Sequence, residues 1–250
     1  MNPLPVSDDL DSYYKANYWF EHHKVIGVVQ MDFDEKNVSK RTIDIYSSLS
    51  NYLSNKSYVL EIGSGFGHTL AYIAHKKSAT VYGVELSEEG AKNSREVYGI
   101  SVFNGSWEKF DAASDIYDVV IMSHVLEHFP DPLAALKKVA DVSKKGAIIY
   151  VEVPNILYPT RSKNLKNWLS KEHISYFSVD KLKFLLTKAG FDTIQVVEKN
   201  FVRIIARASK VSNDFPIRNE YRQVKAAIQK HTVNYFFYRV LRKLKLTSRT

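Results

Sequence analysis

The feature that most constrains this chain is a segment with glycine at every second position, Gly63, Gly65 and Gly67. It directly follows residues 58–62, a β-branched and apolar run, and precedes residues 68–75, which favour a helix. Glycine allows the backbone to approach a ligand closely and to adopt dihedral angles that side chains forbid. The pattern therefore predicts a strand, a ligand-binding loop and a helix in succession.

The spacing of this loop indicates which nucleotide-like ligand it accepts. The dinucleotide fingerprint G-x-G-x-x-G places a pyrophosphate on the helix N-terminus, and His68 stands where its third glycine is required. A cofactor without a pyrophosphate is therefore favoured. Glu85 follows about twenty residues later, at the end of the next predicted strand, where a carboxylate accepts hydrogen bonds from both ribose hydroxyls. The alternative is that the glycines only permit a tight turn and that Glu85 lies on a solvated loop.

Strands and helices alternate along most of the chain, as in a doubly wound sheet. Strands are expected at 58–62, 80–84, 101–103, 117–122, 147–153, 193–197 and 202–206. The predicted fold class is α/β, a Rossmann-like, doubly wound, mostly parallel seven-stranded sheet with N-terminal helices and a C-terminal basic helix. We divide the chain into an N-terminal helical cap at 1–55, a cofactor-binding domain with substrate loops at 56–210 and a basic amphipathic helical tail at 211–250.

Composition excludes several kinds of protein. The chain has 250 residues, 45% of them hydrophobic, which suffices for one main core. It has no cysteine, so disulfides, thiolate metal ligands and a cysteine nucleophile are excluded, and we assign no metal ligands. Residues 1–10 lack a secretory signal, and no apolar run is long enough to cross a bilayer. We therefore expect a cytoplasmic protein.

Residues 61–153, which carry these motifs, resemble the class I S-adenosylmethionine-dependent methyltransferases. The resemblance implies S-adenosylmethionine as cofactor and methyl transfer as the reaction. The residues that it places around the methionine end of the cofactor are Glu61, Gly63, Ser64, Gly65 and Gly67. It places the ribose on Glu85 and the adenine along Leu86. Ser106 and Trp107 fall where the family holds the adenine edge, although the acidic residue often found there is absent.

The segment after the fourth strand is a candidate substrate loop. Residues 124–132 read H-V-L-E-H-F-P-D-P and resemble the H-x-L-E-H-x-x-D-P stretch of the branch that modifies small molecules, sugars and lipid-linked quinones. The loop leaves the carboxyl end of a central strand, where open α/β sheets bind ligands. We therefore expect Ser123 and His124 to border the cofactor and the transferred methyl group, with His124 in a catalytic role. Glu127 and His128 could instead stabilise the loop.

A second candidate loop contains the preferred general base. Residues 172–178 read E-H-I-S-Y-F-S and resemble the E-H-x-x-x-F-S element of the same branch. His173 precedes Ser178, a predicted helix N-cap, and is chosen as the base because histidine titrates near neutrality. The alternative is that His173 anchors the loop. A hydroxyl must lose its proton as it is methylated, whereas an amine need only arrive unprotonated, so two loop histidines favour an oxygen acceptor.

Aromatic residues gather near the N-terminus, at Tyr13, Tyr14, Tyr18 and Trp19. They resemble the Tyr-Tyr-x-x-x-Tyr-Trp segment that often precedes this domain and folds over the cofactor. Tyr18 is taken as a cofactor contact, since aromatic rings attract a sulfonium cation. Packing of these rings in a helical core is the alternative.

The positive charge of the chain is concentrated at its C-terminus. Residues 217–250 hold nine Lys or Arg and one Glu, which accounts for the whole net charge of +8. An apolar stripe at helical spacing lies in the same segment: Val233, Phe236, Phe237, Val240, Leu241 and Leu244. Such a helix could bind an anionic membrane surface or a phosphorylated substrate. The alternative is that the stripe packs on the core or on a second subunit, as in a homodimer.

These observations favour an O-methyltransferase that acts on a sugar hydroxyl in polysaccharide or related small-molecule biosynthesis. N-methylation of a small or phosphorylated amine is the second enzymatic hypothesis. A nucleic acid partner is not expected, because residues 153–156 lack the Asn/Asp-Pro-Pro-aromatic element of base methylation at amino groups. The absence of cysteine also closes the covalent route to cytosine C5. A cofactor-binding module without activity is disfavoured by the complete motif loops.

Overall fold

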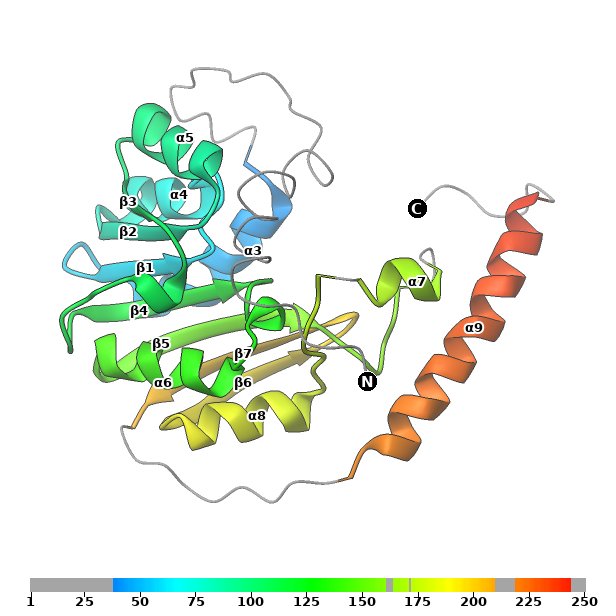
Figure 1. The fold of residues 1–250 in the computed structure, drawn as a ribbon. Helices are drawn as coiled ribbons and strands as arrows, with labels where there is room; N and C mark the ends of the chain where they lie inside the picture. The colour runs from blue at the N-terminus through cyan, green and yellow to red at the C-terminus, as the bar shows by residue number, and fades with distance from the viewer. Residues whose placement is uncertain (1–37, 161–163, 171, 210–218, 244–250) are drawn as a thin grey trace.

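The computed structural model describes residues 38–160, 164–170, 172–209 and 219–243, and Figure 1 draws the path of the chain. The N-terminal aromatic segment, including the predicted cofactor contact Tyr18, lies outside the described residues.

A seven-stranded sheet forms the centre of the described chain, in the order β3-β2-β1-β4-β5-β7-β6. Its strands are β1 Tyr58–Ile62, β2 Thr80–Glu85, β3 Ser101–Asn104, β4 Tyr117–Ser123, β5 Ser143–Pro154, β6 Phe191–Glu198 and β7 Phe201–Ala208. The first five are parallel, and β7 is antiparallel to both β5 and β6. The Rossmann-like, mostly parallel fold expected from the sequence is confirmed.

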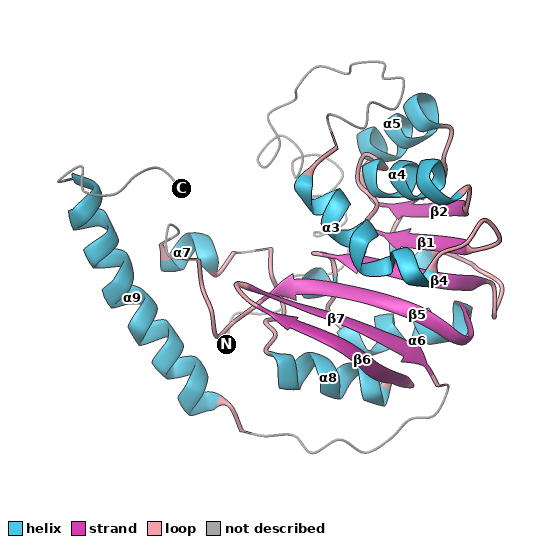
Figure 2. Cartoon of the chain, turned by 180° about the vertical axis from the view of Figure 1, so that it is seen from behind, coloured by secondary structure: helices cyan, strands magenta, loops and turns pink. Residues whose placement is uncertain are grey.

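Helices cover both faces of the sheet (Figures 1 and 2). One face carries α3 Lys40–Leu49, α4 His68–Lys77 and α5 Glu88–Tyr98, and the other carries α6 Pro132–Val142 and α8 Val179–Lys188. Each face has its own apolar core, with Leu49 and Leu70 in the first and Leu136 and Leu186 in the second. The sheet is therefore buried on both sides, as a doubly wound pattern requires.

Strand β4 shows how the sequence builds these two cores. Val120 and Met122 pack in the core with α6 and α8, and Val119 and Ile121 pack in the core with α3 and α4. All four side chains are fully buried. Because alternate residues of a strand point to opposite faces, only a continuous apolar run can fill both cores.

Three helices begin where the sequence supplies capping residues. The side chains of Ser87, Asp131 and Ser178 each accept a hydrogen bond from the backbone N–H three residues later, at the starts of α5, α6 and α8. Pro132 occupies the first turn of α6, where a helix needs no N–H donor. The helix start predicted at Ser178 is confirmed.

The strand order gathers the candidate site residues along one edge of the sheet. Strands β2, β1, β4 and β5 are parallel neighbours, so their carboxyl ends lie side by side. The glycine loop, Glu85 and the segment from Ser123 to His128 all follow these ends. Open α/β sheets bind ligands at this edge.

The two ends of the described chain pack differently. Helix α3 joins the sheet domain, since Ile45 and Leu49 are buried in its core. Helix α9 Tyr221–Lys243 lies beside the domain and contacts α7 Leu165–Trp168, a short helix that the sequence analysis did not predict (Figures 1 and 2). The domain boundaries drawn at residues 55 and 210 stay predictions. Among the described helices, none has the length and apolar character needed to span a bilayer.

Candidate active site

The glycine loop connects β1 to α4 in a left-handed backbone conformation. The φ angles are +71° at Gly63, +54° at Gly65 and +82° at Gly67, in a region that costs other residues strain. The N–H groups of Gly63 and Ser64 donate to the carbonyl of Val84, which ties the loop to strand β2. The predicted succession of strand, glycine loop and helix is confirmed.

Gly67 shows how closely the loop is held. A Cβ atom on this residue would lie 2.6 Å from Ser94 Oγ on α5, a distance that would force one of the two groups to move. The backbone therefore passes through a space that only glycine fits, between the start of α4 and helix α5.

Glu85 binds the glycine loop from the end of β2. Its Oε2 accepts a hydrogen bond from Gly65 N–H at 2.7 Å, and its Oε1 accepts one from Ser87 N–H at 2.7 Å. Burial raises the pKa of this carboxyl group, and the backbone hydrogen bonds oppose that rise. Each carboxylate oxygen retains a second lone pair. Glu85 can therefore hold the loop and still accept the two hydroxyls of a ribose.

Glu61 lies at the end of β1 and is only 4% exposed. Burial raises its pKa to about 8, although the positive charge of Arg41 lowers it. Glu61 Oε2 and Ser64 Oγ are both buried without a hydrogen-bond partner in the part of the chain that the structure describes. A buried carboxylate oxygen is costly unless a donor or a cation reaches it. The ammonium at the methionine end of S-adenosylmethionine is such a group, so these residues fit the cofactor.

The residues predicted around the adenine differ in how they are placed. Asn104 Nδ2 donates to the carbonyls of Glu85 and Leu86 at 3.0 and 3.2 Å, which fixes the backbone at Leu86. The Trp107 indole points into the core, where its Nε1 donates to a backbone carbonyl of α6 at 3.2 Å. Any contact of Trp107 with the cofactor therefore involves its main chain, and the half-buried Ser106 precedes it.

Ser123 is the last residue of β4, and His124 follows it at the same edge of the sheet. Arg41, on α3, donates to Ser123 Oγ at 2.8 Å. The φ angle of His124 is +55°, which is uncommon for a residue with a side chain. Backbone strain of this kind is concentrated at functional sites, where the surrounding structure must hold it.

The imidazole of His124 lies between two carboxylates. Its Nε2 is 3.2 Å from Glu152 Oε1, and its Nδ1 is 3.4 Å from Glu127 Oε1. Burial lowers the pKa of His124, but the interactions with Glu127 and Glu152 outweigh burial and raise it. A protonated imidazole with a carboxylate at each nitrogen cannot accept a further proton. The arrangement favours His124 as a residue that holds the loop, and its predicted catalytic role stays a prediction.

Glu152, on β5, joins this site to β7. It accepts hydrogen bonds from Tyr150 Oη at 2.8 Å and from Arg203, whose Nη2 is 2.7 Å from its Oε2. Burial raises the pKa of Glu152, but the bonds from His124, Tyr150 and Arg203 lower it to about 2. The sequence analysis did not single out Arg41, Glu152 or Arg203. A lone glutamate within an apolar strand was the available signal.

The loop that carries His173 is joined to the loop after β4. The N–H groups of Ile174 and Ser175 both donate to the carbonyl of Glu127 at 3.0 Å. His128 Nδ1 is 3.0 Å from the carbonyl of Glu172, which can only accept a hydrogen bond. The two predicted substrate loops, residues 123–128 and 172–176, therefore form one structural unit, here called the substrate-loop unit.

His173 packs edge-on against the rings of His128 and Tyr176, with centroid distances of 5.0 and 5.9 Å. Its Nδ1 is buried and has no hydrogen-bond partner among the described residues. Burial lowers the pKa of His173 to about 4, although the negative charge of Glu127 raises it. A pKa of about 4 leaves His173 neutral at pH 7.

Three of these residues also have the chemistry of metal ligands. Glu127, His128 and His173 offer ligand atoms that all lie within 4.8 Å of one another. Carboxylate and imidazole groups bind divalent transition metals. We assigned no metal ligands from the sequence, and among the described residues this cluster is the group that could hold a metal ion.

A cleft of about 620 Å³ opens between the starts of α8 and α9. Its lining includes Tyr176, Ser178 and Tyr221. Because Tyr176 also packs on His173, this cleft adjoins the substrate-loop unit.

Known proteins with similar sequences are methyltransferases. A family described as a methyltransferase domain matches residues 35–196. The sarcosine/dimethylglycine N-methyltransferase of Halorhodospira halochloris is 30% identical over 148 residues, which cover 56% of this chain and 53% of that protein. An O-methyltransferase of Pyrenophora dematioidea is 22% identical over 204 residues, which cover 77% of this chain and 73% of that protein. The chain thus spans about half the length of the first relative.

Solved structures share the fold. The crystal structure of a SAM dependent methyltransferase from Aquifex aeolicus matches with a TM-score of 0.55 at 18% identity, over 73% of this chain and 100% of that chain. The family match covers more than half of the present chain. The chain therefore belongs to the methyltransferase domain family, and it has the fold of the class I S-adenosylmethionine-dependent methyltransferases. The family and the fold expected from the sequence are confirmed.

Gly67→Ala should weaken the binding of S-adenosylmethionine by at least about tenfold, because left-handed strain and the clash with Ser94 Oγ displace the loop. Gly99→Ala is the matched control: Gly99 has a φ of +64° and open space around its Cβ position. The control should lose about 1 kcal/mol of stability and keep its affinity. Calorimetric titration of both variants measures this, and equal affinities would contradict the assigned loop.

The raised pKa of His124 has a consequence for stability. The ion pairs of His124 stabilise the folded state fully below the unfolded pKa of 6.5, and this contribution is lost as pH rises through the higher folded pKa. The difference in free energy of unfolding between the wild type and His124→Gln should therefore be largest below pH 6.5 and shrink above it. Urea unfolding at a series of pH values measures this difference, and a constant value would mean that His124 is not charged in the folded protein.

Proposed function

We propose that this protein transfers a methyl group from S-adenosylmethionine to a hydroxyl of a sugar or glycan precursor, with His173 as the general base. The observation that carries this proposal is the buried, unpartnered Nδ1 of the neutral His173, within the substrate-loop unit. The proposed setting is a cytoplasmic pathway of carbohydrate or polysaccharide biosynthesis.

The reaction requires a methyl acceptor whose nucleophilic atom lies in line with the methyl carbon and the sulfur of the cofactor. When bound, S-adenosylmethionine supplies an electrophilic methyl group on a cationic sulfur. A hydroxyl oxygen becomes a good nucleophile only as its proton leaves. His173 can take that proton because its imidazole is neutral at pH 7. The resulting positive charge would be balanced by Glu127, whose carboxylate belongs to the same 4.8 Å cluster.

Positioning supplies the rest of the rate enhancement. The fixed backbone at Glu85 and in the glycine loop would hold the cofactor. The paired loops at residues 123–128 and 172–176 would hold the methyl acceptor. Orientation of two reactants can lower a barrier by about 7–11 kcal/mol. The strained, doubly paired His124 stabilises this geometry and leaves proton transfer to His173.

Support for a sugar-like acceptor comes from two sources. The segments H-V-L-E-H and E-H-I-S-Y-F-S resemble those of the branch that modifies small molecules and sugars, and one relative of 22% identity is named an O-methyltransferase. The cleft lined by Tyr176 and Ser178 offers hydroxyl groups that could bind a polar acceptor.

A second candidate function is N-methylation of a small amine. The observation that favours it is Glu127, which is 1% exposed and whose Oε2 has no hydrogen-bond partner among the described residues. Such a carboxylate would attract a cationic amine. One relative of 30% identity is named a sarcosine/dimethylglycine N-methyltransferase.

His173→Ala should slow methyl transfer to a hydroxyl by about 100-fold or more, because the base is lost, while the affinity for S-adenosylmethionine stays unchanged. His75→Ala, at an exposed position of α4, is the matched control and should keep full activity. Transfer of labelled methyl groups to nucleotide sugars, free glycans and amines measures both variants. Normal transfer to an amine by His173→Ala would favour the second function, and collapse of cofactor affinity would make His173 structural.

The same assay separates a histidine base from a metal site. Under the proposed mechanism, activity persists after dialysis against a chelator. If activity disappears and an added divalent cation restores it, the cluster of Glu127, His128 and His173 binds that cation and His173 is a ligand.

A further inference from the structure

Helix α9 has two apolar faces, and within the described part of the chain only one of them packs against other elements. The packed face contains Val224, Ile228, His231 and Tyr235, which follow one another at spacings of four and three residues. His231 is 3% exposed, and its ring lies 5.8 Å from that of Trp168 on α7. This face attaches the helix to the rest of the described chain.

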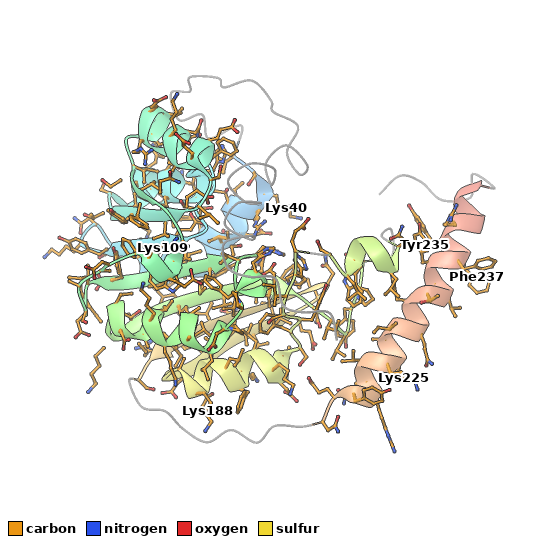
Figure 3. All side chains as sticks on the ribbon, viewed as in Figure 1. Lys40, Lys109, Lys188, Lys225, Tyr235 and Phe237 are labelled. Atoms are coloured by element: carbon orange, nitrogen blue, oxygen red, sulfur yellow. The ribbon has the colours of Figure 1, made fainter. Side chains whose placement is uncertain are left out.

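The second apolar face is exposed. Val233 is 55% exposed, Phe236 is 65% exposed and Phe237 is 58% exposed. Val233 is two residues from both His231 and Tyr235, and two residues rotate a helix by roughly 200°, to its opposite side. Figure 3 shows Phe237 pointing away from the sheet domain and Tyr235 pointing toward α7. Of the alternative that the stripe packs on the core or on a second subunit, packing on the core is therefore wrong for these three residues.

Helix α9 is strongly basic, and exposed cationic side chains flank its exposed apolar face. The helix contains six Lys or Arg residues and no Asp or Glu: Arg222, Lys225, Lys230, Arg239, Arg242 and Lys243. The side chains of Arg222, Lys225, Lys230 and Arg239 are exposed. Large apolar side chains beside cationic ones match an anionic bilayer, which buries the first in its acyl boundary and binds the second with its headgroups.

We propose that the face of α9 formed by Val233, Phe236 and Phe237, with the neighbouring Lys and Arg residues, binds the surface of an anionic lipid bilayer. A second copy of the chain is a poorer occupant, because a two-fold contact would place this cationic helix against itself. This inference concerns where the protein acts and does not depend on which acceptor is methylated.

The start of α9 is bonded to the sheet domain, so binding of α9 to a bilayer would also orient that domain. Ser178 Oγ lies 2.7 and 2.8 Å from the carboxylate oxygens of Glu220, the buried residue before the helix. Ser178 also caps α8 and lines the cleft beside Tyr176. A membrane-bound α9 would therefore hold the substrate-loop side of the domain at a defined position relative to the bilayer.

The test is flotation of the full chain with vesicles of equimolar phosphatidylcholine and phosphatidylglycerol. The wild type should bind these vesicles and not pure phosphatidylcholine. The double variant Phe236→Glu, Phe237→Glu should bind about 100-fold more weakly or worse, since both rings lose their burial in lipid. A matched double variant at other exposed apolar positions, Ile116→Glu, Ile194→Glu, should bind as the wild type does.

A charge-reversal set tests the electrostatic half of the proposal. Lys225→Glu, Lys230→Glu, Arg239→Glu should reduce binding by on the order of 100-fold, whereas the exposed set Lys56→Glu, Lys92→Glu, Lys145→Glu should not. Circular dichroism and the thermal midpoint would verify that each variant is folded.

Three results would overturn the proposal. The first is equal vesicle binding by the wild type and the Phe236, Phe237 variant. The second is that the wild type does not bind vesicles but forms a homodimer, and that the same double variant dissociates this dimer. The face would then be a subunit interface. The third is salt-dependent binding of RNA instead of vesicles through the same residues.

Discussion

The structure depends on one buried carboxylate that links two crossover connections. Glu85 accepts hydrogen bonds from Gly65 and Ser87, so it fixes the loop after β1 and the loop after β2 to each other. Its burial makes both bonds strong, because water does not compete with them. The left-handed glycines fit around this carboxylate, and Glu61, whose Oε2 has no hydrogen-bond partner among the described residues, lies at the end of the neighbouring strand. The proposed cofactor site depends on this arrangement.

The second half of the site holds two histidines whose pKa values are shifted in opposite directions. Glu127 lies near both loop histidines, yet the two carboxylates at His124 raise its pKa, whereas burial lowers the pKa of His173 to about 4. Environment alone thus drives the pKa values of two identical side chains apart. Groups whose pKa values are driven apart in this way are typical of acid and base chemistry at one site.

The strands, the helix starts and the glycine loop could be predicted from local sequence, whereas contacts between distant segments could not. The strands follow from apolar runs. The helices begin at capping residues such as Ser87 and Asp131, whose effects act within one helical turn. The pairing of Glu152 with Arg203 depends on β7 lying beside β5, which no short pattern encodes. The sequence of α9 is apolar on two sides, so periodicity alone could not show which face packs.

The account depends most directly on the cofactor, and a calorimetric titration of the wild-type protein with S-adenosylmethionine tests it. The account predicts one-to-one binding that Glu85→Ala abolishes or severely weakens, because the variant loses both the loop anchor and the acceptors for the ribose hydroxyls. Absence of heat with S-adenosylmethionine, together with clear binding of NAD, would contradict it.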